Sequence, residues 1–411
     1  MSQDAWHTAP DREPKNVLLT DAKRKTLPAG SATASVPALL LATTLAALSS
    51  APATATPAQQ MPSNPRQILK TNFTQKIAIF GTDDRRRLSI RHKGLASRIG
   101  VLTHAGTGSV CTAFCVSRDV VATAGHCVVG TLNQPVSEPW LLNFRRDSDS
   151  GAATPIAGAA SHSVSNSILT GARRLNTRPP INASTDWALL RLAAPACKDG
   201  GLKISSQTAA EVAASAALGQ VYHVAYHRDL AHWKLAIARA CTMVPRKRTG
   251  TAEQLAKDFE HPRNMLLHAC DTDAASSGSP LLVDGDDGPE VVGINVGTYV
   301  RSRVITHDGQ VVQRLDQEVI ANTALLAAPL AGRIRTMTQD GILSRPTEIR
   351  RIQEKLAKLG MFSGARDGRY GPITRNAIEA YESRMKFPVT GIATRGLLER
   401  LEAVEAVTAS K

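Results

Sequence analysis

Short apolar runs separated by turn-forming residues fill the stretch from residue 78 to residue 328, and this pattern limits the fold more than any other feature. The clearest runs are three to six residues long: 120–122, 187–192, 221–226, 281–283 and 291–296. Many short strands with few helical stretches are typical of a β barrel or sandwich. The sequence therefore predicts a mainly β domain in this stretch.

The apolar period changes after Arg345-Pro346. Apolar residues then recur every three to four positions and stop at a glycine: Ile349, Ile352, Leu356, Leu359 and Gly360. This spacing predicts a helix over residues 347–359 with Thr347 as its N-cap. Pro372 can begin a second helix, and the leucines near residue 400 indicate a third. A small three-helix domain is therefore expected to follow the β domain.

Length and composition leave room for two folded domains and little else. At about 150 residues per domain, 411 residues hold two domains plus non-globular segments. A content of 43% hydrophobic and 20% charged residues excludes a disordered chain and a multi-span membrane protein. We expect these segments: 1–55 signal peptide, 56–77 linker or propeptide, 78–328 β domain, 329–345 linker, 346–403 helical domain and 404–411 tail.

The chain is strongly basic, with 49 Lys and Arg against 35 acids and a net charge of +14. Such a surface attracts polyanions: nucleic acid, anionic lipid or an anionic cell wall. Aromatic residues are only 4% of the chain, which argues against a single-stranded nucleic-acid binder. The basic triplets 85–87 and 246–248 are interpreted as solvated loop charges. No nucleic-acid partner is expected.

The first 55 residues have the order of a secretory signal. Bases at residues 23–25 precede an apolar run over residues 36–48, and Ala53-Thr54-Ala55 offers an A-x-A cleavage site. The run is shorter than the ~20 residues of a bilayer-spanning helix. Small flanking residues leave an uncleaved anchor as the alternative. We predict export to the periplasm or the medium.

Six cysteines lie between residues 111 and 270, and none forms a C-x-x-C pair: Cys111, Cys115, Cys127, Cys197, Cys241 and Cys270. An even number of cysteines in an exported chain predicts disulfides. Six buried thiols would be the better interpretation only if the leader is not a signal.

Three segments of the β domain carry the residue types of acyl transfer. Residues 122–127 place His126 after a strand-like run, residues 186–192 begin with a lone Asp186, and residues 273–280 form a small-residue turn around Ser277. A hydroxyl nucleophile needs a base and an acid that fixes the tautomer of the base. Amides at the Ser277-Gly278 turn can converge on an oxyanion. Each segment alone is weak evidence, but together they indicate a catalytic triad.

A metal site is a weaker hypothesis. His223 and His227 share a face of a helix or of a strand, but no acid stands at ligand spacing beside them. We interpret them as solvated or packed histidines. No metal and no cofactor is expected.

These motifs resemble the trypsin-like serine peptidases of the chymotrypsin superfamily across about residues 78–328. Thr-Ala-Gly-His-Cys at 123–127 is similar to the histidine motif, and residues 186–190 are similar to the aspartate strand. Residues 276–280 resemble the serine motif in the form found in bacterial glutamyl-endopeptidase-like members, and Gly-Thr-Asp-Asp-Arg at 81–85 resembles a segment near the start of those domains. The resemblance implies a two-barrel fold.

The resemblance also implies roles for individual residues. Ser277 would be the nucleophile, His126 the general base and then acid, and Asp186 its orienting carboxylate. The amides of Ala275 and Ser277 would form the oxyanion hole, and Asn295 would lie in the substrate pocket. It further implies disulfides Cys111–Cys127 and Cys241–Cys270, which leaves Cys115 with Cys197.

Two positions depart from the family pattern. Ser276 replaces the acid that pairs with a new amino terminus in chymotrypsin itself, so ion-pair activation is not expected. Ala275 replaces the usual glycine, and its Cβ resists some oxyanion-hole conformations. An inactive copy therefore remains the alternative.

The helical tail resembles the peptidoglycan-binding domain family across about residues 346–403. The match rests on residues 356–360, 367–377 and 390–391, whereas Tyr381-Glu382 stands where that family often has Phe-Gln. This segment carries 11 bases and 7 acids, a net charge of +4 that suits a polyanionic wall. We therefore predict an exported, wall-associated, monomeric serine endopeptidase acting on protein or peptide substrates. The alternative is a wall-binding protein whose peptidase-like domain is an inactive scaffold.

Overall fold

The structure is a computed structural model that describes the chain from residue 66 to residue 409 with internal gaps. The described residues are 66–74, 78–129, 141–144, 154–155, 167–172, 174–230, 234–239, 241–243, 252–307, 310–339, 341–343 and 345–409. The predicted signal peptide and the basic run 246–248 lie outside them. Among the described residues, no helix has both the length and the apolar character needed to cross a membrane.

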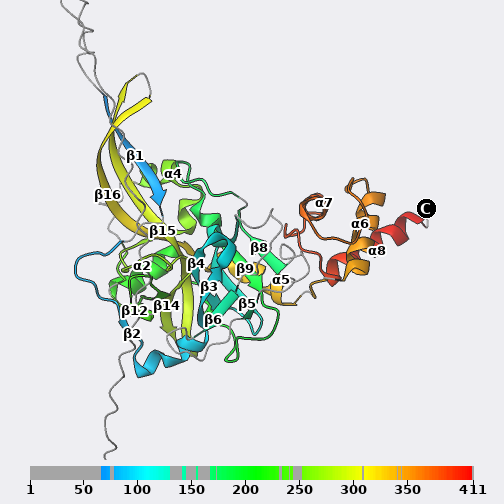
Figure 1. The fold of residues 1–411 in the computed structure, drawn as a ribbon, viewed down its shortest axis with the longest axis horizontal. Helices are drawn as coiled ribbons and strands as arrows, with labels where there is room; N and C mark the ends of the chain where they lie inside the picture. Colours follow the sequence, from blue (N-terminus) through cyan, green and yellow to red (C-terminus); the bar gives the residue numbers. More distant parts are fainter. Residues whose placement is uncertain are drawn as a thin grey trace, which may run out of the picture. The chain divides into compact units, whose positions relative to one another are not determined.

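Two β-sheets build the larger domain (Figure 1). The first sheet is antiparallel, and its strands lie in this order: β7 (Thr154–Pro155), β6 (Leu141–Phe144), β3 (Ile99–His104), β4 (Ser109–Cys115), β5 (Val120–Ala124), β9 (Trp187–Arg191) and β8 (Ile168–Thr170). Its central strands are covered on both faces, as β5 is buried at every position.

The second sheet is larger and is centred on a long hairpin. Its main order is β13 (Met265–His268), β16 (Gln310–Leu326), β15 (Gly288–His307), β14 (Pro280–Gly285), β11 (Tyr222–Tyr226), β12 (Leu235–Ala238) and β2 (Arg86–Arg87). Two further strands pair with β15: β1 (Arg66–Thr74), which is antiparallel, and β10 (Lys203–Ile204), which is parallel. The mainly β, two-barrel prediction is confirmed.

A single hydrophobic cluster joins the two sheets. It includes Val101 and Leu190 from the first sheet and Tyr222 and Val296 from the second, all at most 1% exposed. This shared core fixes the sheets against each other, so that loops from both can meet at one site.

Short helices connect the strands. Within the described ranges of this domain, the α-helices are α1 (His126–Val129), α2 (Ala209–Ala217), α4 (Ala252–Asp258) and α5 (Ala331–Gln339). The 3₁₀ segments are Ile90–Ser97, Ala105–Thr107, Ala183–Thr185, Pro262–Asn264 and Ala328–Leu330. Thr208 and Glu211 close a capping box at the start of α2.

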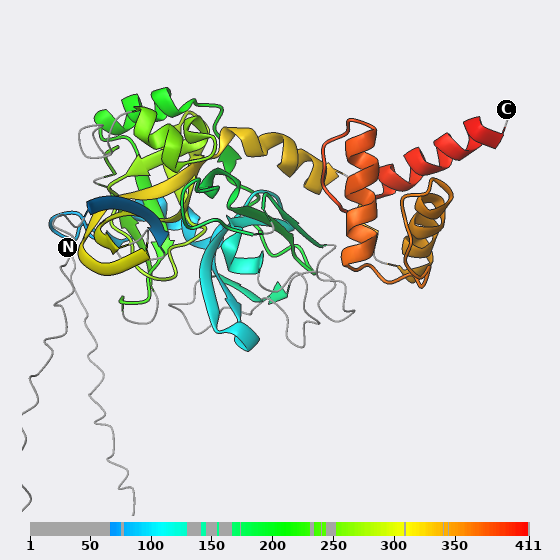
Figure 2. The ribbon, with the colours of Figure 1, turned by 90° about the horizontal axis from the view of Figure 1, so that it is seen from above.

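The C-terminal helices form a unit with its own core, drawn in orange to red in Figure 2. They are α6 (Pro346–Lys358), α7 (Pro372–Arg384) and α8 (Arg395–Ala409). Their cluster of buried residues is drawn entirely from Leu343 to Leu401. Pro372 begins α7 as expected, but the prediction of Thr347 as a cap is wrong: Arg345 is the N-cap, and Pro346 begins α6. Proline suits the first helical turn because its missing N–H would have no partner there.

Candidate active site

His126 and Asp186 meet at one end of the first sheet. His126 follows β5 and Asp186 precedes β9, and these strands pair with Ala124 opposite Trp187. Asp186 Oδ2 accepts a hydrogen bond from His126 Nδ1 at 2.7 Å, and Oδ1 accepts one from the His126 backbone N–H at 2.6 Å. A Cβ at Gly125 would lie 3.1 Å from Asp186 Oδ1, so glycine leaves room for this approach.

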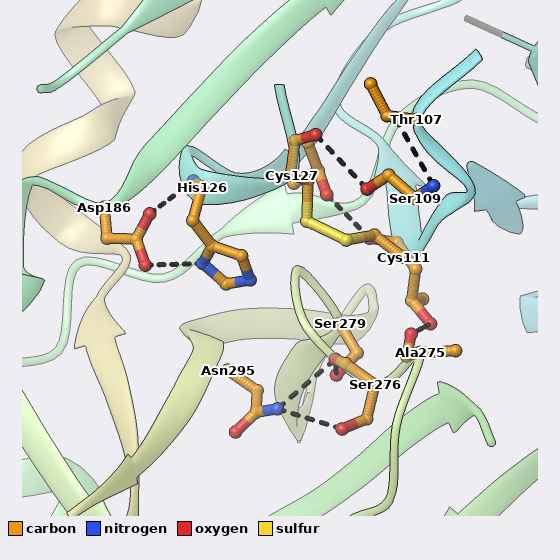
Figure 3. Close-up of a disulfide and its surroundings, with 12 residues drawn as sticks. Thr107, Ser109, Cys111, His126, Cys127, Asp186, Ala275, Ser276, Ser279 and Asn295 are labelled. Carbon is orange, nitrogen blue, oxygen red and sulfur yellow. Dashed lines mark hydrogen bonds and ion pairs between the residues drawn. A yellow bond between two sulfur atoms is a disulfide. The ribbon is translucent and has the colours of Figure 1, made fainter. Parts of the chain in front are cut away.

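The pair has the geometry of a base held by a carboxylate. The Asp186 side chain is 1% exposed and that of His126 is 10% exposed. With Nδ1 donating to Asp186, Nε2 is the nitrogen left to accept a proton. In Figure 3, the Nε2 end of the imidazole ring points away from Asp186.

The serine loop, residues 273–280, bridges the two sheets. It leads into β14 of the second sheet, and the Ser277 carbonyl accepts a hydrogen bond from Thr112 N of β4 in the first sheet at 2.9 Å. Gly278 has φ +86°, and a Cβ there would lie 2.1 Å from Thr123 Oγ1. Only glycine fits, so the glycine after Ser277 is required by the fold.

Two amides of the serine loop lack acceptors within the described part of the chain, those of Ala275 and Ser277. By contrast, Ser276 N donates to the Asp273 carbonyl and Gly278 N donates to the Asn295 carbonyl. Ala275 has φ +79°, a left-handed conformation that costs a residue with a Cβ roughly 1–2 kcal/mol. The loop therefore keeps this conformation although alanine replaces glycine.

One cavity of about 370 Å³ collects these groups. Its lining includes the imidazole of His126, the whole turn 272–277 and the β15 residues Asn295, Gly297 and Thr298. Thr107 to Cys111 and Arg228 complete the wall. The three residues expected to form a triad are thus arranged with His126 and Ser277 on the cavity and Asp186 behind His126. Thr272, Thr298 and Arg228 carry no motif, so the sequence did not identify them.

Asn295 closes the cavity beneath the serine loop (Figure 3). It is 2% exposed, and its Nδ2 donates to the backbone carbonyl and to Oγ of Ser276, each at 3.3 Å. Behind it, His268 Nδ1 accepts a hydrogen bond from Cys270 N at 3.3 Å. Burial lowers the pKa of His268 to about 3, and a hydrogen bond with Asn295 opposes this shift. Because Nδ1 accepts a hydrogen bond, the neutral imidazole has its proton on Nε2.

All six cysteines form disulfides, as the predicted export implies. The pairs are Cys111–Cys127, Cys115–Cys197 and Cys241–Cys270. Cys111, Cys127 and His126 lie close enough together to resemble a metal site. Since the two sulfur atoms are bonded to each other, they offer no thiolate.

The two histidines considered for metal, His223 and His227, are packed in the core. Both are 0% exposed, and so is His268, whose ring lies beside that of His223. His223 Nε2 lies 2.5 Å from Ser279 Oγ, and His227 Nδ1 accepts a hydrogen bond from Asp273 N at 3.3 Å. His223 and His227 therefore each contact a residue of the serine loop by a polar interaction.

The Gly-Thr-Asp-Asp-Arg segment also supports the loop. Arg85 binds Asp83 at 2.8 Å and Asp229 at 2.5 Å, and Asp229 N donates to Asp273 Oδ2. The hydrogen bond from Arg85 lowers the pKa of Asp83 to about 2. The motif is thus connected to the serine loop by polar contacts rather than lying on the cavity.

In the helical domain, motif residues hold the fold. Gln353 Nε2 donates to the Arg369 carbonyl at 2.9 Å, and its Oε1 accepts from Gly368 N at 2.9 Å. Glu382, the departure from the family pattern, is 4% exposed and accepts hydrogen bonds from the amides of Thr390 and Gly391. The acid therefore secures the 390–391 turn.

Two sheets around one core, with a His–Asp pair and a serine turn at their junction, define a chymotrypsin-like β domain. Comparison with protein families agrees: the trypsin-like peptidase domain matches residues 111–294, and the peptidoglycan binding domain matches residues 345–401. The chain therefore contains a trypsin-like peptidase domain followed by a C-terminal peptidoglycan-binding domain. No curated protein sequence matches the chain significantly.

Proposed function

We propose that this protein is a serine endopeptidase of the bacterial glutamyl-endopeptidase-like type. Ser277 attacks the carbonyl carbon of a peptide bond while His126 Nε2 takes its proton. His126 then gives the proton to the leaving amine, and water repeats the sequence to release the acyl group. Asp186 holds the tautomer and stabilises the imidazolium. The amides of Ala275 and Ser277 donate to the oxyanion.

One observation carries this proposal. A carboxylate-held imidazole, a serine on a tight turn and two amides without acceptors among the described residues all border or support the same cavity. Structural explanations account for each feature singly, but an acyl-transfer site accounts for them together.

We further infer that the protein acts outside the cytoplasm, at the cell wall. Support comes from three disulfides, which persist in oxidising compartments. The peptidoglycan-binding domain supplies the wall partner, with domain boundaries expected near 78–328 and 346–403. The substrate is protein or peptide, and the protein is proposed to act as a monomer.

Labelling with a fluorophosphonate tests the catalytic proposal. The full chain should react once, at Ser277, and the Ser277→Ala variant should not react. Ser206→Ala, which removes an exposed serine away from the cavity, is the matched control and should label normally. A chain that folds but does not react would instead support the inactive scaffold, the alternative favoured by Ala275 in place of glycine.

A further inference from the structure

Strand β15 has one edge that leads directly out of the cavity. Its other edge pairs with β16 along most of its length. On the cavity edge, β14 pairs with β15 as far as Ile294, and β1 pairs with it from Thr298 to Thr306. Between these two partners lie residues 295–297, of which Asn295 and Gly297 line the cavity. The edge therefore continues from the cavity into the stretch covered by β1.

The direction of β1 matches that of a peptide entering the cavity. Arg66 pairs with Thr306 and Thr74 pairs with Thr298, so the C-terminal end of β1 lies at a residue of the cavity wall. In Figures 1 and 2, β1 is the blue arrow beside the long yellow strands. A substrate lying antiparallel on residues 296–298, with its carbonyl at Ser277, would extend its N-terminal side along this same edge.

The chain returns to the cavity immediately after β1. Ala78 exchanges two backbone hydrogen bonds with Thr272, at 3.1 and 3.0 Å, and Thr272 lines the cavity. Four Cα steps separate Thr74 from Ala78, a span of at most ~14 Å. Thr74 and Ala78 are therefore each paired with a residue that lines the cavity, Thr298 and Thr272 respectively. Residues 75–77 between them lie outside the described ranges.

We propose that residues 66–74 are a built-in competitor of the substrate. β1 occupies the part of the β15 edge on which the residues N-terminal to the scissile bond add as a strand. Addition of an extended peptide to a sheet edge draws its affinity from main-chain hydrogen bonds, so unrelated sequences can use the same edge. A tethered strand competes at an effective concentration in the millimolar range.

This inference rests on the proposed function and specifies its substrate class. The favoured substrates are extended peptide segments long enough to replace β1. Short peptides, which end before Thr298, do not meet the competitor. Activity against long substrates is thus restrained until β1 is displaced or removed.

Two full-chain variants test the proposal. Lys70→Pro with Thr71→Pro removes two neighbouring backbone N–H groups. Because alternate residues of an antiparallel strand donate to the partner strand, one of these two N–H groups points toward β15. Lys70→Ala with Thr71→Ala changes the same side chains and keeps both N–H groups.

For a peptide with about eight residues before the cleaved bond, the proline pair should raise kcat/KM by about tenfold or more relative to the alanine pair. For a two-residue substrate, the variants should agree within about twofold. Equal rates on the long peptide would overturn the proposal.

A second measurement uses the unmodified chain and does not depend on variant folding. Hydrogen exchange is followed with two peptidyl phosphonates bound to the enzyme, one with six residues before the phosphonate and one with a single residue. The long inhibitor should increase exchange of the 66–74 amides, and the short one should not. Unchanged exchange with the long inhibitor contradicts the proposal.

A third measurement separates this inference from the catalytic proposal. A labelled peptide with the sequence of residues 66–74 is titrated against both variants carrying Ser277→Ala. Binding to the proline variant and not to the alanine variant supports the competitor even if the enzyme is inactive. Equal binding to both, or to neither, contradicts it. Failure of fluorophosphonate labelling alone would count against the proposed function only.

Discussion

Ala275 is a residue whose backbone conformation and side chain disagree. Its φ of +79° belongs to the left-handed region, which glycine adopts without strain. We expect Ala275→Gly to raise the free energy of unfolding by up to about 1 kcal/mol, since relief of strain exceeds the added freedom of the unfolded chain. Hydrolysis should be retained. Urea unfolding of both proteins measures the difference.

The adjacent alanine provides the control for that experiment. Ala274 is not among the residues with positive φ, so Ala274→Gly should lower the free energy of unfolding by roughly 0.5–1 kcal/mol. If Ala275→Gly is destabilising to the same extent, the left-handed conformation at residue 275 carries no strain.

The hydrogen bonds around Asp186 predict a graded effect of substitutions in the proposed triad. Ser277→Ala and His126→Ala should each lower kcat on the order of 10⁶-fold, because the triad acts as a unit. Asp186→Asn should lower it about 10⁴-fold by favouring the wrong tautomer of His126. Steady-state kinetics on a peptide substrate, with melting temperatures as the folding control, measures both. Near-normal activity in a folded Ser277→Ala variant would reject the triad.

Asn295 predicts a preference before the cleaved bond that is not restricted to Glu. In the glutamyl endopeptidases that this chain resembles, a histidine at this position helps bind the substrate carboxylate. A neutral amide lacks that charge, and hydrogen bonds to charged groups contribute about 1.5–3 kcal/mol. The Asn295 Nδ2 is also engaged by Ser276. Profiling on a mixed peptide library should show uncharged or broadly tolerated residues, and an exclusive preference for Glu would contradict this.

The strands beneath the serine loop give the protein an acid-sensitive core. His223 lies on β11, His227 follows it, and His268 ends β13. Burial lowers the pKa of His227 and of His268 to about 3, and that of His223 well below its usual range. An unfolded chain would bind protons on these residues near pH 6.5.

This arrangement predicts a loss of stability as pH falls. Between about pH 6.5 and pH 3, the unfolded state binds more protons, so the free energy of unfolding decreases with decreasing pH. Each histidine contributes about 1.4 kcal/mol per pH unit within that window. Urea unfolding at pH 7, 6 and 5 should show the decline, and His268→Gln should reduce its slope by one histidine's share.

Local sequence patterns predicted the elements that depend on local signals. The apolar runs correspond to buried strands such as β5 and β9, and the period after residue 345 corresponds to α6. The segment predicted as a linker or propeptide contains β1, and the one predicted as a linker contains α5. β1 is defined by pairing with a strand more than 220 residues away, which no local pattern reports. The same holds for the candidate site. The residues that belong to local motifs were predicted from the sequence, whereas Thr298 reaches the cavity wall through long-range strand pairing.

At the level of the whole chain, a basic helical unit accompanies the peptidase domain. Most of its buried apolar residues form a cluster of their own between Leu343 and Leu401, whereas Ile392 belongs to the cluster of the β domain. The segment 346–403 has a net charge of +4. A unit with its own core can fold and bind separately from the domain to which it is joined. Binding to a wall is therefore expected to be independent of catalysis.

Removal of residues 346–411 should leave hydrolysis of a small peptide intact and weaken sedimentation with insoluble peptidoglycan. The proposed catalytic groups all lie before residue 300, and the segment removed is the one that matches the peptidoglycan binding domain. The full chain with Ser277→Ala is the matched control, because it should pellet as the unmodified chain does. Added salt should weaken pelleting of the full chain, since screening reduces the attraction between its positive charge and a polyanionic wall. If the truncated chain pellets as fully as the complete one, the helical domain is not the wall anchor.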